Sequence, residues 1–163
     1  MAEQTLDTLF HETLKDIYYA ERTIGTALRK MARAAQDPEL KTAFQTHEQE
    51  TQAQYERLSE VFDALGKRPT GKTCDAIEGI IAEAQEIMEE FKGSPALDAG
   101  LLAAAQAVEH YEIARYGTLK AWAAQLGLAD AERLLDQTLQ EETATDEILT
   151  GLAETVINAA AQG

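Results

Sequence analysis

The chain has 163 residues, a length that suits one domain with a single sizeable core. It carries 14 Lys and Arg residues against 29 Asp and Glu residues, which gives a formal net charge of -15. This charge argues against nucleic acid and anionic membranes as partners, because both attract basic proteins. Cys74 is the single cysteine, so it forms no disulfide within the chain. We expect a cytoplasmic protein, because the sequence shows neither a signal-peptide pattern nor a membrane span.

The first two predicted helices form a hairpin. Apolar residues recur every three or four positions over residues 5–35, which predicts a long amphipathic helix. Asp37, Pro38 and Glu39 then supply an N-cap, a proline at the first helical position and an acidic first turn. A second helix is therefore expected over 39–65. Because the connection is short, the two helices should be antiparallel.

Three further helices are expected in the rest of the chain. A basic loop that contains Gly and Pro, residues 66–72, precedes a shorter helix over 74–91. The Gly-Ser-Pro sequence at 93–95 separates it from a third long helix over 96–125. A last helix is expected over 130–158 and would pair with the one before it.

The two hairpins predict the fold class. Residues 45–51 and 137–143, in the second and last helices, are identical at four of seven positions. This match indicates two quasi-equivalent helix pairs. We therefore expect an all-α protein in which residues 1–163 form a single ferritin-like domain. It would be a four-helix bundle of two antiparallel hairpins with an additional short helix in the crossover.

Acidic residues lie on the apolar faces of the long helices. Glu21, Glu112 and Glu142 each fall at helical spacing between apolar residues that should face the core. Glu109 lies three residues before Glu112 and therefore beside it on the helix surface. An unpaired buried charge costs several kcal/mol, against a total stability of about 5–15 kcal/mol for a domain. These carboxylates therefore need a partner.

The second helix adds a histidine to this set. His47 lies on the apolar face with Glu50 three residues further on, and Asp146 flanks the inward glutamate of the last helix. Ferritin-like dinuclear sites take a Glu from each of two helices and a Glu-x-x-His motif from the other two. Here Ala53 and Thr145 stand where the two histidines of those motifs would be. Any site would therefore be rich in carboxylates.

Two interpretations of these residues remain open. Two iron or manganese ions would remove the buried charge, because both metals accept carboxylate and imidazole ligands. The candidate metal ligands are Glu21, His47, Glu50, Glu109, Glu112, Glu142 and Asp146. Alternatively, Arg22, Arg57 and Arg115, with tyrosine hydroxyls, would hold the carboxylates without metal. The protein would then be a non-enzymatic structural or interaction protein.

Four motifs spread along the chain point to one bacterial family. They are Asp16-x-Tyr18-x-Ala20-Glu21, His47-x-x-Glu50-Thr51, Cys74-x-Ala76-x-Glu78-Gly79 and Val108-Glu109-His110-Tyr111-Glu112-Ile113-Ala114. Through them the chain resembles the YciE/YciF family of bacterial ferritin-like, stress-associated proteins over nearly its whole length. The resemblance implies a four-helix fold with an extra helix, a homodimer and a link to stress responses. It also implies that the superfamily's metal-bearing positions are occupied here by Glu21, Glu50, Glu112 and Glu142.

The expected function combines the residue pattern with the resemblance. We expect a stress-associated protein whose core holds a dinuclear iron or manganese site and handles peroxide, oxygen or iron. If the protein is an enzyme, it would be a di-metal oxidoreductase of the peroxidase or ferroxidase kind. The sequence assigns no catalytic residue.

Overall fold

The computed structural model describes residues 3–163, which form helices connected by short loops. The helices are α1 (Leu6–Ala34), α2 (Pro38–Ala64), α3 (Asp75–Glu90), α4 (Leu97–Gln125), α5 (Ala129–Leu152), a π-helical turn η1 (Ala153–Ile157) and α6 (Asn158–Ala160). The prediction of an all-α fold is confirmed. The expected range 130–158 was one helix, whereas the π-helical turn ends α5 at Leu152. No helix within residues 3–163 is long and apolar enough to cross a membrane.

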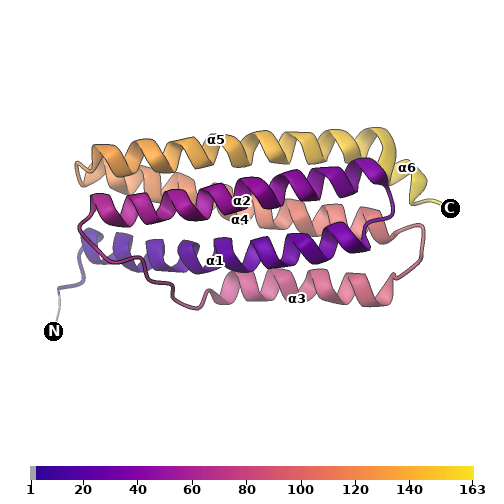
Figure 1. Ribbon diagram of the computed structural model, residues 1–163, viewed down its shortest axis with the longest axis horizontal. Helices are drawn as coiled ribbons and strands as arrows, with labels where there is room; N and C mark the ends of the chain where they lie inside the picture. The colour runs from indigo at the N-terminus through magenta and orange to yellow at the C-terminus, as the bar shows by residue number, and fades with distance from the viewer. Residues whose placement is uncertain (1–2) are drawn as a thin grey trace.

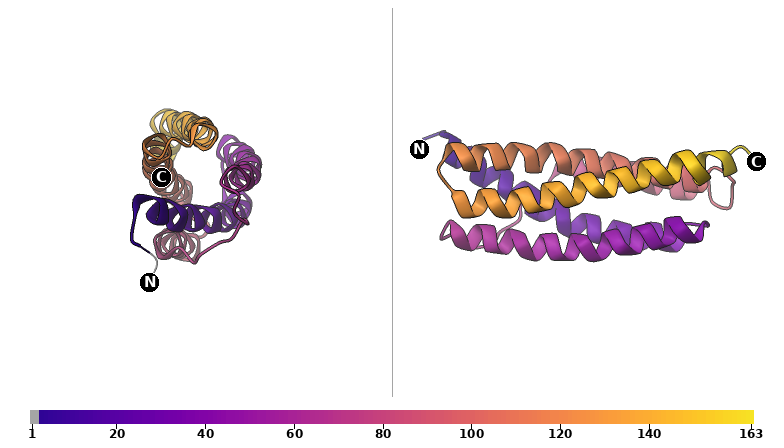
Figure 2. Two further views of the ribbon diagram at one scale, coloured as in Figure 1. Left: turned by 90° about the vertical axis from the view of Figure 1, so that its left-hand side faces the viewer. Right: turned by 90° about the horizontal axis from the view of Figure 1, so that it is seen from above.

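The four long helices lie side by side along the long axis of the molecule, and α3 lies outside them (Figure 1). α1 packs against α2, α2 against α5, α5 against α4 and α4 against α1, so the four form a ring in the end-on view (Figure 2). α2 and α4 therefore face each other across a diagonal. α3 packs against α1 and α4 on the outer side of the ring.

Two capping aspartates fix how the helices are aligned at one end. The side chain of Asp37 accepts hydrogen bonds from the backbone N–H groups of Glu39 at 2.8 Å and Leu40 at 3.0 Å, which begins α2. Asp98, in the first turn of α4, accepts hydrogen bonds from the backbone N–H groups of Gln36 at 2.8 Å and Asp37 at 2.7 Å. These bonds tie the α1–α2 turn to the start of α4.

The interior of the ring has apolar ends and a polar layer between them. On each long helix, buried apolar residues both precede and follow a buried polar stretch. The polar layer consists of Glu21 on α1; His47, Thr51 and Gln54 on α2; Glu109 and Glu112 on α4; and Thr138, Glu142 and Thr145 on α5. The apolar ends stabilise the fold, because each fully buried large side chain contributes about 1.5–3 kcal/mol. The same packing shields the polar layer from bulk water at both ends of the bundle.

Candidate metal centre

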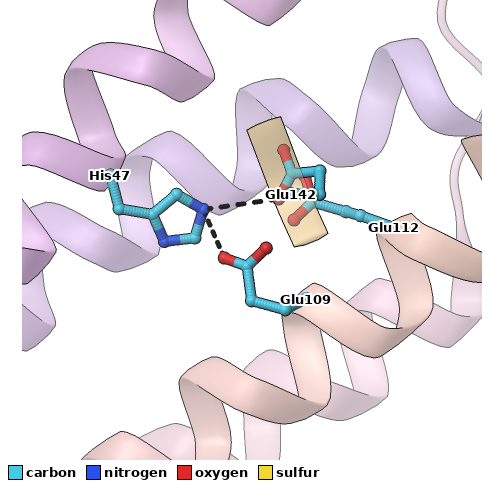
Figure 3. A group of neighbouring side chains, drawn as sticks. All are labelled: His47, Glu109, Glu112 and Glu142. Carbon is cyan, nitrogen blue, oxygen red and sulfur yellow. Dashed lines mark ion pairs between the residues drawn. The ribbon is translucent and has the colours of Figure 1, made fainter. Parts of the chain in front are cut away.

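Four buried side chains from three helices converge in the polar layer (Figure 3). They are His47 from α2, Glu109 and Glu112 from α4, and Glu142 from α5, and we call them the core cluster. One nitrogen or oxygen atom from each residue lies within 4.8 Å of the corresponding atoms of the other three. The glutamates are 0% exposed and His47 is 2% exposed. The cluster is therefore shielded from bulk water.

Helical spacing explains why these side chains point inward. His47 lies three residues after the buried Phe44 and four before the buried Thr51, on the inner stripe of α2. Glu142 lies in the same way between Thr138 and Thr145 on α5. The two glutamates of α4 are three residues apart and share one face. On each helix, the side chains of the cluster therefore lie on the same face as the buried apolar residues.

The cluster atoms approach one another without hydrogen bonds. His47 Nε2 lies 2.6 Å from Glu109 Oε1 and 3.8 Å from Glu142 Oε2. Within residues 3–163, neither ring nitrogen of His47 and none of the carboxylate oxygens of Glu109, Glu112 and Glu142 has a hydrogen-bond partner. Buried polar groups in native proteins almost always have a partner. The cluster therefore presents nitrogen and oxygen atoms of the kinds that bind metal ions.

Glu21 of α1 lies at the edge of the cluster. It is 0% exposed, and the hydroxyl of Tyr116 donates a hydrogen bond of 2.5 Å to its Oε1. Its Oε2 has no partner within the described residues. Burial, followed by the charge of Glu142, raises the pKa of Glu21 to about 8. One oxygen of this carboxyl is thus held in place, and the other is free.

Burial also controls protonation in the core cluster. It raises the pKa of Glu109 to about 8 and raises the pKa of Glu112 and of Glu142 well above the usual range. Burial lowers the pKa of His47, against the opposing charge of the carboxylates. The imidazole of His47 is therefore neutral at neutral pH, which is the form that binds metal ions. Without a cation, the carboxyl groups hold protons at neutral pH.

Besides Glu21, two further predicted ligands, Glu50 and Asp146, lie outside the cluster. Glu50 is half-buried, and its Oε2 accepts a hydrogen bond of 3.1 Å from the hydroxyl of Thr145. Oδ1 of Asp146 lies 3.3 Å from Nε2 of His110, and the side chain of His110 is 69% exposed. Thr145 was not predicted as a partner of Glu50. Its position three residues after Glu142, on the same face of α5, was the available signal.

Arg57 reaches the polar layer through a hydrogen bond of 2.7 Å to the hydroxyl of Thr138, but the arginines of the alternative interpretation do not pair with its buried glutamates in the described residues. Arg57 forms a two-point ion pair with Glu141 at 2.8 and 2.9 Å. Arg115 is exposed, and its guanidinium carbon lies 5.3 Å from the centre of the Tyr111 ring. Arg22 is exposed too. Among residues 3–163, no Lys or Arg forms an ion pair with a buried glutamate of the polar layer. Within the described residues, the buried glutamates are therefore not held by arginines as the alternative interpretation required, and Tyr116 is the tyrosine that bonds to one of them.

The donor set fits a transition-metal ion. Donor atoms about 2.1 Å from a metal ion lie at most about 4.2 Å from one another. The four donor atoms of the core cluster lie within 4.8 Å, so small side-chain movements would bring all of them to binding distance. Three carboxylates and one neutral imidazole form a set that suits iron and manganese. A second ion would need further ligands, and Glu21, Glu50 and Asp146 all lie close enough to act on the charge of Glu109.

The fold and the site define a class: an all-helical protein with a carboxylate–histidine cluster in its core. The family described as "Domain of unknown function (DUF892)" matches residues 5–162, and the chain belongs to this family. Protein YciF of Escherichia coli (strain K12) is 44% identical over 163 residues, which cover 99% of this chain and 98% of YciF. The resemblance to the YciE/YciF family is thereby confirmed.

Solved structures share the architecture. The crystal structure of the Escherichia coli stress protein YciF matches with a TM-score of 0.91 and 44% identity over 96% of this chain and 99% of that one. YcfI from Rhodopseudomonas palustris matches with a TM-score of 0.88 and 49% identity. The match covers 90% of this chain and 94% of YcfI. A protein from Xanthomonas campestris pv. campestris, with a TM-score of 0.78, 22% identity and 97% of both chains covered, shares the fold alone.

Proposed function

We propose that this chain is a stress-associated, ferritin-like four-helix-bundle protein whose core cluster holds iron or manganese. One observation carries the proposal: three fully buried glutamates lie around a neutral histidine, and their six carboxylate oxygens have no hydrogen-bond partner among residues 3–163. If charged without a partner, each buried carboxylate would cost several kcal/mol, so these groups either hold protons or bind cations. Cations at this position turn the unpaired oxygens into ligands.

The residues divide into two groups around a metal pair. The first ion would be held by the core cluster, and Glu21 and Glu50 would complete the site of the second. The hydroxyl of Tyr116 fixes one oxygen of Glu21, and the hydroxyl of Thr145 fixes one oxygen of Glu50. Each carboxylate then keeps its other oxygen for a ligand. When bound, an iron or manganese pair supplies redox chemistry in a core from which bulk water is excluded.

The helix arrangement supports the ferritin-like assignment. α1 and α2 form one antiparallel hairpin, α4 and α5 form a second, and the connection between the hairpins contains α3 (Figure 1). In ferritin-like sites, Glu-x-x-His motifs provide ligands from two helices. Here α2 has His47 and Glu50 in the reverse order, and α4 has Glu109 and Glu112 at the same spacing. The result is a variant site richer in carboxylates.

The proposed role follows from the site and from the family. A carboxylate-rich pair of iron or manganese ions suits reactions of peroxide or oxygen, or the binding of iron itself. The relative in Escherichia coli is described as a stress protein, and such reactions protect cells under oxidative stress. The competing proposal is a structural protein whose buried carboxyl groups remain protonated and bind no metal.

Thermal unfolding with and without metal separates the two proposals. A ligand that binds only the folded state stabilises it by about 2.7 kcal/mol at a hundred times its dissociation constant. We therefore expect iron(II) or manganese(II) to raise the melting temperature of the chelator-treated protein. Glu112→Gln should abolish most of this rise. Equal melting temperatures with metal and with chelator would support the structural protein instead.

A further inference from the structure

A pocket between α1 and α2 connects the protein surface with the polar layer. Its volume is about 310 Å³, and Glu21 and Thr51 lie in its inner wall. A water molecule takes about 30 Å³ of liquid volume, so the pocket has room for a ligand of several non-hydrogen atoms. Arg22 and Arg29 from α1 also line it. The pocket lies outside the four residues of the core cluster.

Two buried polar atoms in the pocket wall have no partner. Thr51 is 1% exposed and its hydroxyl forms no hydrogen bond within the described residues. Oε2 of Glu21, which is 0% exposed, likewise has none. A buried group without a hydrogen bond costs about 1–3 kcal/mol. The hydroxyl of Thr51 therefore points to a ligand at the inner end of the pocket, whereas Oε2 of Glu21, an acceptor, points to a cation beside it.

Two arginines and two glutamates line the pocket: Arg22, Arg29, Glu21 and Glu48. Arg29 Nε lies 2.8 Å from Glu48 Oε1, so this arginine is partly neutralised. Arg22 forms no ion pair with any residue in the part of the chain that the structure describes. The arginines repel metal cations and attract anions. By contrast, a pocket of about 140 Å³ between α2 and α5 reaches His47 and Glu50 and contains no Lys or Arg.

A glycine leaves the passage between the two helices open. Gly25 of α1 is buried in the pocket wall opposite Thr51. A Cβ atom at Gly25 would lie 3.8 Å from Thr51 Cγ2, which is an ordinary contact. Alanine therefore fits at this position, but a longer side chain would fill the space that leads to Glu21.

We propose that the α1–α2 pocket binds a small oxygen-donor anion of the size of a carboxylate, held between Arg22 and Thr51, and brings it to the Glu21 end of the metal centre. The inference rests on the proposed function, because a metal ion beside Glu21 compensates the negative charge of that carboxylate. The planar guanidinium of Arg22 suits the two oxygens of a carboxylate. The residues of the pocket thus favour a small oxygen-donor anion as the ligand that approaches the metal ions.

Azide binding to the cobalt(II)-loaded full-length protein tests the inference. Azide is a small anion that changes the visible absorption of cobalt, and acetate serves as the carboxylate competitor. We expect saturable azide binding that acetate displaces. Arg22→Gln should weaken azide binding at least about tenfold, because it removes a charged partner. Arg33→Gln, an exposed arginine in the last turn of α1, is the charge-matched control and should leave the affinity unchanged.

The cobalt titration itself separates failure of the pocket from failure of the metal centre. Arg22 is exposed, so Arg22→Gln should fold and take up cobalt with the affinity of the wild-type protein. Gly25→Leu should prevent azide binding in the same assay. Cobalt uptake with equal azide affinity in wild type and Arg22→Gln, or azide binding that acetate does not displace, would overturn the pocket assignment. A protein that takes up no cobalt would overturn the proposed metal centre as well.

Discussion

His47 Nε2 and Glu109 Oε1 lie 2.6 Å apart, although α2 and α4, which carry them, face each other across the diagonal of the helix ring. Neither atom has a hydrogen-bond partner in the part of the chain that the structure describes. The interior of the ring is therefore narrow enough for side chains from opposite helices to meet. This contact spans the polar layer from α2 to α4 and places the imidazole of His47 next to the three carboxyl groups of the core cluster.

Glu109→Gln should separate metal binding from folding. Without metal, the side chain of Glu109 is protonated at neutral pH, since its pKa is about 8, and glutamine has nearly the same shape and no charge. We expect the metal-free variant to unfold within a few degrees of wild type but to bind manganese(II) more than about tenfold more weakly. Isothermal titration calorimetry measures this affinity. Asp146→Asn is the control, and an equal loss in both variants would contradict the proposed ligand set.

The metal-free protein should lose stability as pH rises. Glu21 and Glu109 titrate near pH 8 in the folded protein, whereas the ordinary value is 4.5. Between these values the folded state holds protons that the unfolded state has released, so the free energy of unfolding decreases with increasing pH. Urea denaturation at about pH 6 and about pH 9 should show higher stability at the lower pH. Glu109→Gln should make this difference smaller; stability that is constant or increases over the range would refute the prediction.

Tyr116→Phe should destabilise the fold through Glu21. The substitution removes the hydroxyl that donates to Oε1 and leaves both oxygens of this buried carboxyl without a partner. We expect a loss of about 1–3 kcal/mol in the free energy of unfolding at neutral pH. The matched control is Tyr19→Phe, whose hydroxyl donates to the exposed Glu78, with a loss below about 1 kcal/mol. Equal losses would mean that the buried hydrogen bond is unimportant.

Two glycine substitutions should have opposite effects. A Cβ atom at Gly100 of α4 would lie 2.6 Å from Ile87 Cγ2 of α3, so Gly100→Ala should force the two helices apart. We expect a loss of about 1–3 kcal/mol. Gly151 of α5 has no atom within 4 Å of the corresponding position, so Gly151→Ala should stabilise the helix by about 0.5–1 kcal/mol. Thermal unfolding of the two variants tests the α3–α4 packing directly.

Helix positions were accessible from the sequence because local signals specify them. The Asp37 cap and the regular spacing of apolar residues predict the first hairpin to within one residue at each end. The π-helical turn after Leu152 was not predicted, because one irregular turn hardly alters the spacing of apolar residues. The inward positions of Glu21, Glu112 and Glu142 also followed from spacing alone.

The membership of the cluster was harder to predict. Spacing identifies a helix face, but it does not show how wide a sector of that face lies in the interior. His47 and Glu109 enter the cluster, whereas Glu50 and Asp146 lie at its periphery. Similarly, Arg115 is three residues from a buried glutamate, yet its side chain lies over an aromatic ring outside the core. That the core binds metal ions and that the chain forms a homodimer both remain predictions.

Metal analysis of the purified protein tests the central claim most directly. The protein is produced in medium rich in iron and manganese, and its metal content is measured by mass spectrometry. We predict about two ions per wild-type chain and a large reduction in Glu142→Gln, which retains the shape of the side chain. Fewer than about one-tenth of an ion per wild-type chain would contradict a metal centre in this core.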